Sequence, residues 1–110
     1  MSDTRIELIL GCMFAGKSEE LLRRTSRYTA IGKKVLLINH INDTRTDNSI
    51  KTHSNLKTSA IKVNLLVPLI DTELFKEAYV IGIDEAQFFK DLNIFVTMAE
   101  KHNKIIIISG

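Results

Sequence analysis

The chain has 110 residues, of which 45% are hydrophobic and 25% charged, and this balance excludes a disordered polypeptide and fits one small globular domain. A net charge of +2 is too small to indicate a nucleic-acid or membrane partner, and no run of about 18 apolar residues could form a membrane-spanning helix. The single cysteine, Cys12, excludes a disulfide framework and a cysteine-rich zinc site. The N-terminus is too polar to resemble a signal peptide, so we expect a cytoplasmic protein.

The sequence begins with a strand and a helix that flank a glycine-rich loop. Arg5–Leu10 predicts a strand, and the stretch from Ser18 to about Ile31 predicts a helix that Gly32 would cap. Between them stands the complete G-x-x-x-x-G-K-S pattern of a phosphate-binding loop, Gly11-Cys12-Met13-Phe14-Ala15-Gly16-Lys17-Ser18. In this setting the N–H groups of the loop and the N-terminus of the helix bind phosphate oxygens. We therefore expect this loop to bind a nucleoside triphosphate, with Lys17 on the β- and γ-phosphates and the Ser18 hydroxyl on Mg²⁺.

The middle of the chain holds a second strand, a long polar stretch and a short helix. Val35–Ile38 is short, continuous and apolar, as in a strand buried on both faces. Residues 39–58 are rich in Asn, Asp, Thr and Ser without a clear period, and we expect a long loop there with room for a short strand. Asp71 or Thr72 is placed to cap a short helix that ends near Ala78.

The last part of the sequence predicts a strand, a helix and a strand. Tyr79–Glu85 is an apolar run that ends in two carboxylates, and Asp91–His102 has an apolar stripe at helical spacing. Lys104–Ser109 contains four consecutive isoleucines, so we expect a fourth strand buried on both faces. Strands that alternate with helices in this way predict an α/β fold of three layers, in which a mostly parallel sheet is covered on both faces. Ligands bind such sheets at the carboxyl ends of the strands, where the glycine loop and the two carboxylates both fall.

Asp84 and Glu85 form the second candidate site motif. An apolar strand that ends in an aspartate is typical of the Walker B element, in which Asp84 would hold Mg²⁺. Glu85 follows directly and is placed to take a proton from the attacking nucleophile. An acidic pair that merely ends a strand is common. Together with a phosphate-binding loop, however, the pair predicts metal-assisted phosphoryl transfer.

A resemblance to a known family narrows the substrate. The glycine loop and the segment Gly82-Ile83-Asp84-Glu85-Ala86-Gln87-Phe88-Phe89 resemble those of the thymidine kinases of the human cytosolic and poxvirus type, as do Asp43-Thr44-Arg45 and Thr52-His53. The resemblance spans about residues 5–110. It implies a P-loop (RecA-like) nucleotide-binding domain with ATP and Mg²⁺ as cofactors. Such a kinase transfers the γ-phosphate of ATP to the 5′-hydroxyl of thymidine.

The resemblance also implies roles for single residues. Glu85 would be the catalytic base that activates the 5′-hydroxyl. Asp84 and Gln87 would belong to the nucleotide site, and Phe88 would lie against the thymine ring with Met13 nearby.

Three other ring side chains are given no role in the site. Phe89 is expected to pack in the core, and His40 and His102 are expected at the solvent edge.

In the family, the sequence continues from such a last strand into a small lobe with four zinc ligands, which has no counterpart up to Gly110. We therefore expect residues 1–110 to be a nucleotide-binding domain of a fragment or truncated form that is incomplete at the C-terminus and binds no zinc. The expected partners are ATP and thymidine, without nucleic acid or membrane, and the intact protein is expected to be a homo-oligomer.

Two alternatives to a working kinase stay open. One is a nucleotide-binding remnant without catalytic activity. The other is a helicase-type ATPase, because Asp84-Glu85-Ala86-Gln87 also matches a DEAQ box, in which Glu85 would activate water. Helicase motors need two nucleotide-binding domains, which disfavours the second alternative.

Overall fold

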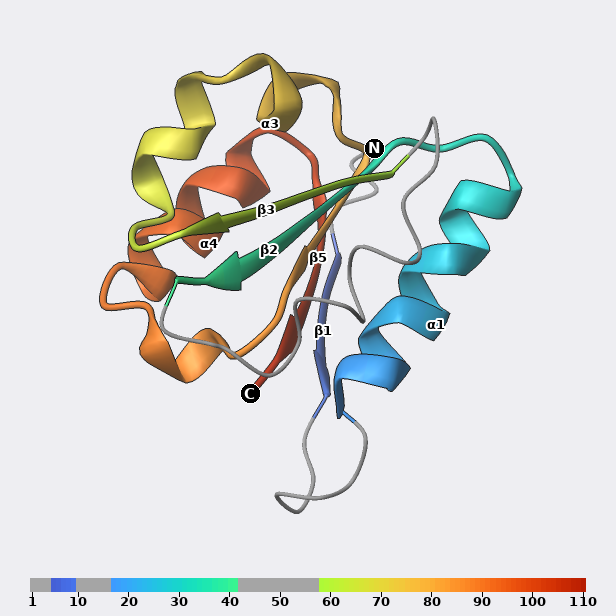
Figure 1. The fold of residues 1–110 in the computed structure, drawn as a ribbon. Coiled ribbons are helices and arrows are strands. Elements are labelled where there is room, and N and C mark those ends of the chain that lie inside the picture. Colours follow the sequence, from blue (N-terminus) through green and yellow to red (C-terminus); the bar gives the residue numbers. More distant parts are fainter. Residues whose placement is uncertain (1–4, 10–16, 42–57) are drawn as a thin grey trace.

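A parallel sheet forms the centre of the computed structural model, which describes residues 5–9, 17–41 and 58–110 (Figure 1). Within these residues the sheet has five strands, β1 (Arg5–Ile9), β2 (Val35–His40), β3 (Thr58–Val63), β4 (Val80–Ile83) and β5 (Ile105–Ser109). Their spatial order is β1-β5-β4-β2-β3, and every neighbouring pair is parallel. The predicted α/β class with a parallel sheet is confirmed.

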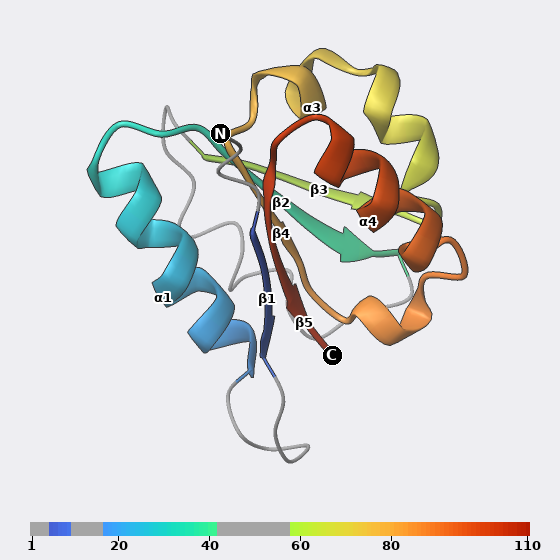
Figure 2. The same ribbon diagram turned by 180° about the vertical axis from the view of Figure 1, so that it is seen from behind.

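Helices cover both faces of this sheet. The helix α1 (Lys17–Ala30) lies on one face, and α3 (Glu73–Glu77), α4 (Leu92–Lys101) and the 3-10 helix η1 (Val67–Asp71) lie on the other, as the view from behind shows (Figure 2). A second 3-10 helix, η2 (Ala86–Phe88), follows β4. The result is the predicted arrangement of three layers.

The caps that end two of these helices match the sequence signals. Gly32 has φ +85°, the left-handed conformation that a helix C-cap requires and that glycine adopts without strain. The hydroxyl of Thr72 accepts a hydrogen bond from the Phe75 N–H at 3.3 Å, so Thr72 is the N-cap of α3.

Side chains along the central strands alternate between two cores. In β5, Ile106 and Ile108 belong to the cluster beneath α3 and α4, whereas Ile105 and Ile107 belong to the cluster beneath α1. β2 and β4 alternate in the same way. Because all three strands are buried on both faces, they are continuously apolar up to the polar residues at the carboxyl ends of β2 and β5.

Close packing of α1 on the sheet depends on Gly82 in β4. A Cβ atom at this position would lie 2.9 Å from Leu37 Cδ2, 3.1 Å from Leu21 Cδ1 and 3.2 Å from Thr25 Cγ2. A larger residue would require these neighbouring side chains to move. The glycine therefore lets α1, the helix that begins at the phosphate-binding loop, pack closely on β4.

The expectation of four strands is wrong, because β3 forms a further strand that begins at Thr58, where the expected loop of residues 39–58 ends. It pairs with β2 over its whole length, from Val35 opposite Thr58 to His40 opposite Val63. Its sequence mixes polar and apolar residues, and its residues 59–63 stay at least partly exposed, since β3 lies at the edge of the sheet.

Candidate functional site

The candidate site lies where the parallel strands end. β1 leads into the predicted phosphate-binding loop, and β4 leads into Asp84 and Glu85. The loop residues Gly11, Cys12, Met13, Phe14, Ala15 and Gly16 lie outside the described residues, as do the side chains of Lys17 and Ser18. The backbone of Lys17 and Ser18 begins α1, as predicted. Figure 1 shows this helix start at the same end of the sheet as the ends of β1 and β5. The N-terminus of α1 is therefore at the carboxyl edge, where a phosphate group would meet it.

Asp84 is buried directly after β4, with only 2% of its surface exposed. Its N–H donates to the Ile38 carbonyl at 2.8 Å, which extends the pairing of β4 with β2 by one residue. Its Oδ1 accepts from the Glu85 N–H at 2.9 Å. Since Ile83 faces α3 and α4, alternation along the strand turns the next side chain toward α1. The Asp84 carboxylate is therefore held on the side of the sheet where α1 begins.

Glu85 has a strained backbone. Its φ and ψ angles are 51° and 46°, a left-handed conformation that costs free energy for any residue with a Cβ. Asn103 is the other left-handed non-glycine residue among those described, and asparagine tolerates this conformation better than glutamate. The strain ends β4 abruptly and starts η2. Such strain, concentrated on a buried carboxylate, is typical of functional sites.

The Glu85 side chain is 8% exposed and has a defined hydrogen-bond donor. The Gln87 Nε2 donates to Glu85 Oε2 at 2.7 Å. Gln87 is in turn confined by Gly110, where a Cβ atom would come within 2.6 Å of Gln87 Oε1 and 2.9 Å of the Ala86 nitrogen. The end of β5 therefore lies against η2, and Gln87, although exposed, directs its amide at the candidate base.

The two phenylalanines after Gln87 have different environments. Phe89 is 5% exposed and belongs to the core beneath α3 and α4, as predicted. Phe88 is 43% exposed at the end of η2. An exposed aromatic ring beside Glu85 is available to stack on a planar base.

His40 is a site residue that the sequence analysis missed. We expected it at the solvent edge, but it is only 6% exposed, so that expectation is wrong. Its ring packs edge-on against Phe89, with centroids 4.8 Å apart, and is tilted against Phe88 at 5.5 Å. The available signal was its position two residues after the apolar run Val35–Ile38, which pairs with β4. His102 is exposed as expected, with its ring edge-on against Phe75.

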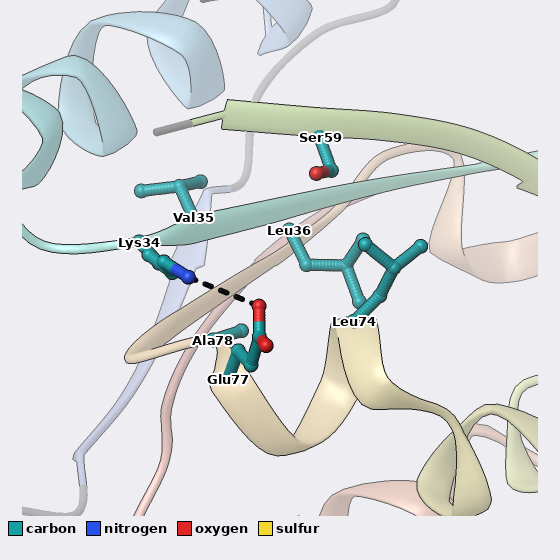
Figure 3. Close-up of a pocket in the computed structure, with 7 residues that line it drawn as sticks. All are labelled: Lys34, Val35, Leu36, Ser59, Leu74, Glu77 and Ala78. Carbon is teal, nitrogen blue, oxygen red and sulfur yellow. Dashed lines mark hydrogen bonds and ion pairs between the residues drawn. The ribbon is translucent and has the colours of Figure 1, made fainter. Parts of the chain in front are cut away.

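A pocket of about 70 Å³ lies at the other end of the sheet, where β2 and β3 begin (Figure 3). In Figure 3, Lys34 and Glu77 point toward each other, and their Nζ and Oε1 atoms are 3.0 Å apart. Leu36, Leu74 and Ser59 also line the pocket. Parallel sheets bind ligands at the carboxyl ends of their strands, so this pocket is separate from the candidate site.

Comparison of the sequence with known proteins identifies the family of the chain. A family model described as thymidine kinase matches residues 4–110. The chain belongs to the thymidine kinase family. Members of the family have a P-loop α/β fold, in agreement with the parallel sheet and with the order of β1 and α1 along the chain.

Poxvirus thymidine kinases are among the relatives. The thymidine kinase of sheeppox virus (strain KS-1) is 42% identical over 105 residues, a match that covers 96% of this chain and 58% of the relative. That of raccoon poxvirus is 39% identical over 110 residues, which is 100% of this chain and 61% of the relative. The chain therefore spans only 58–61% of the length of these relatives. None of the helices in the described parts of the chain is long and apolar enough to cross a membrane.

Proposed function

We propose that this chain is the ATP-binding part of a thymidine kinase, which transfers the γ-phosphate of ATP to the 5′-hydroxyl of thymidine. The observation that carries the proposal is the buried pair Asp84–Glu85 at the carboxyl end of β4, on the edge where α1 begins. Thymidine is proposed as the phosphate acceptor because the relatives are thymidine kinases by name.

The residues at this edge suit Mg²⁺ and ATP. Asp84 offers a carboxylate oriented by the Glu85 N–H, and carboxylate oxygens are ligands that Mg²⁺ prefers. Asp84 would hold the ion together with the Ser18 hydroxyl, and Lys17 would bind the β- and γ-phosphates. The bound ion supplies positive charge that neutralises the phosphate oxygens.

Glu85 is the proposed catalytic base. Its carboxylate would accept the proton of the 5′-hydroxyl while the oxygen attacks the γ-phosphate. The hydrogen bond from Gln87 limits the rotation of this carboxylate, and burial keeps bulk water from competing for it. Phe88 would lie against the thymine ring, near Met13 of the loop.

The proposal extends to location and assembly. We propose a cytoplasmic protein that self-associates. Self-association is supported by β1, which lies at one edge of the sheet formed by the described residues and exposes 38% of Ile6 and 58% of Leu8. Unpaired strand edges with apolar side chains favour contacts with other chains.

Calorimetric titration of Mg·ATP into the parent chain and into Lys17→Ala tests the nucleotide site. We expect the parent to bind and the variant to lose most of the affinity with an unchanged circular dichroism spectrum, because the phosphates lose the charge of the lysine. Equal affinities would contradict the proposed phosphate-binding loop.

A product assay with labelled thymidine and Mg·ATP then tests the reaction. Formation of thymidine 5′-monophosphate supports the kinase. Binding of Mg·ATP without any phosphate transfer would favour the inactive remnant, and phosphate release that does not depend on thymidine would favour an ATPase.

A further inference from the structure

The hydroxyl of Ser109 is buried without a hydrogen bond. The residue is 1% exposed, and within residues 5–9, 17–41 and 58–110 its Oγ is the buried side-chain oxygen or nitrogen that has no partner. Leaving such a group unpaired lowers stability, so each case in a folded protein calls for an explanation. Ser109 belongs to neither motif recognised in the sequence.

The sheet places this hydroxyl between the two halves of the candidate site. β5 lies between β1 and β4, and Ser109 is its last residue. On one side Ser109 pairs with Ile9, the last residue of β1 before the predicted loop. On the other side Ile108 pairs with Ile83, so Asp84 comes next to Ser109 at the following position. Ile9, which precedes the predicted loop, and Asp84 therefore flank Ser109.

The Ser109 side chain also points to the face of the sheet that α1 covers, the same face as Asp84. Ile105 and Ile107 of β5 belong to the core beneath α1, and alternation along the strand turns Ser109 the same way. Asp84 faces α1 for the same reason. Figure 2 shows β1, β5 and the start of α1 together at this edge of the molecule.

We propose that the Ser109 hydroxyl donates a hydrogen bond to the terminal phosphate of a bound nucleoside triphosphate. Phosphate oxygens are strong acceptors, and a serine hydroxyl that lacks an acceptor within the protein has a proton available for them. The terminal phosphate is the one that must lie close to Glu85 for transfer, and Ser109 is at the end of the strand adjacent to β4. This inference rests on the proposed function, since it needs a bound triphosphate.

Two measurements on Ser109→Ala test the proposal, one without nucleotide and one with it. Without nucleotide, the melting temperature should stay the same or rise, because the substitution removes an unpaired buried oxygen. With Mg²⁺ present, calorimetry should show ATP affinity about tenfold weaker, as expected for a lost hydrogen bond to a charged oxygen, and ADP affinity within about twofold of the parent. Opposite effects on stability and on ATP binding would not arise from a structural serine.

Ser26→Ala is the matched control. It is the same chemical change on the exposed side of α1, where the hydroxyl donates to the Leu22 carbonyl at 2.6 Å. We expect unchanged affinity for both nucleotides. If Ser109→Ala does not fold, Ser109→Cys is the alternative variant, because its thiol is a weaker donor than the hydroxyl and nearly the same size. We expect the same preferential loss of ATP affinity in this variant.

Two results would overturn the inference. In the first, the parent and the Ser109 variant bind ATP with equal affinity. In the second, the variant loses as much affinity for ADP as for ATP. A parent chain that binds no ATP would overturn the proposed function as well, which distinguishes the two failures.

Discussion

Both ends of the parallel sheet bury polar groups, but the hydrogen bonding and backbone strain of these groups differ between the two ends. At the amino end, the Lys104 ammonium donates to the carbonyls of Lys76 and Ala78 at 3.0 and 2.6 Å, and burial lowers its pKa. At the carboxyl end, Glu85 has a strained backbone and Ser109 an unpaired hydroxyl. The buried ammonium at the amino end therefore has its hydrogen-bond acceptors within the protein, whereas the carboxyl end retains unfavourable features that a bound ligand can relieve.

The largest effect that we predict concerns the carboxyl end. Glu85→Gln should lower the rate of thymidine phosphorylation by about 10²–10⁴-fold while Mg·ATP affinity stays the same, because the amide cannot accept the proton. Steady-state kinetics and calorimetry measure the two quantities. Glu77→Gln is the control at the amino end. It removes an exposed ion pair with Lys34 and should change neither the phosphorylation rate nor the Mg·ATP affinity. Parental turnover in Glu85→Gln would mean that another group is the base.

The second prediction concerns the amino end. Lys104→Met leaves the carbonyls of Lys76 and Ala78 without their donor, so the free energy of unfolding should fall by about 2 kcal/mol. Mg·ATP affinity should not change. Urea denaturation of this variant and of Lys34→Met, which removes an exposed amine, gives the comparison. A larger loss of stability in Lys34→Met than in Lys104→Met would contradict the role of the buried ammonium.

The smallest prediction concerns the aromatic contacts of His40. His40→Ala should raise the KM for thymidine by about fivefold with little change in kcat, because Phe88 loses a ring that positions it, a contact worth about 1 kcal/mol. His40→Phe keeps a ring there and should keep the KM.

His102→Ala serves as the control for this series, because it removes a similar edge contact from Phe75, outside the site. A KM that rises equally in His40→Ala and His40→Phe would show that packing on Phe88 is not the cause.

These regions also differ in how well the sequence predicts them. The strands β2, β4 and β5 are continuously apolar because helices cover both faces, and such runs are recognisable without a structure. The strand β3 was not recognisable, because at the edge of the sheet residues 59–63 are at least partly exposed and polar residues interrupt its apolar ones. The candidate site motifs are also predictable, because each consists of residues close together in sequence, as Asp84 and Glu85 are.

Features that depend on contacts distant in sequence were not predictable. His40 is buried because η2 brings Phe88 and Phe89 back onto the end of β2. Asp91 precedes α4 as expected, but its carboxylate accepts hydrogen bonds from the distant N–H groups of Leu66 and Val67. The unpaired Ser109 hydroxyl likewise becomes apparent only once the neighbours of β5 are known.

The most direct test of the central claim, that the carboxyl end holds Mg·ATP, is the Mg²⁺ dependence of ATP affinity in the parent chain and in Asp84→Asn. Calorimetric titrations with and without Mg²⁺ measure it. We predict that Mg²⁺ strengthens ATP binding to the parent and has little effect on Asp84→Asn, because the amide is a poor replacement for the carboxylate ligand. An equal gain from Mg²⁺ in both proteins would contradict the claim and would place the metal away from Asp84.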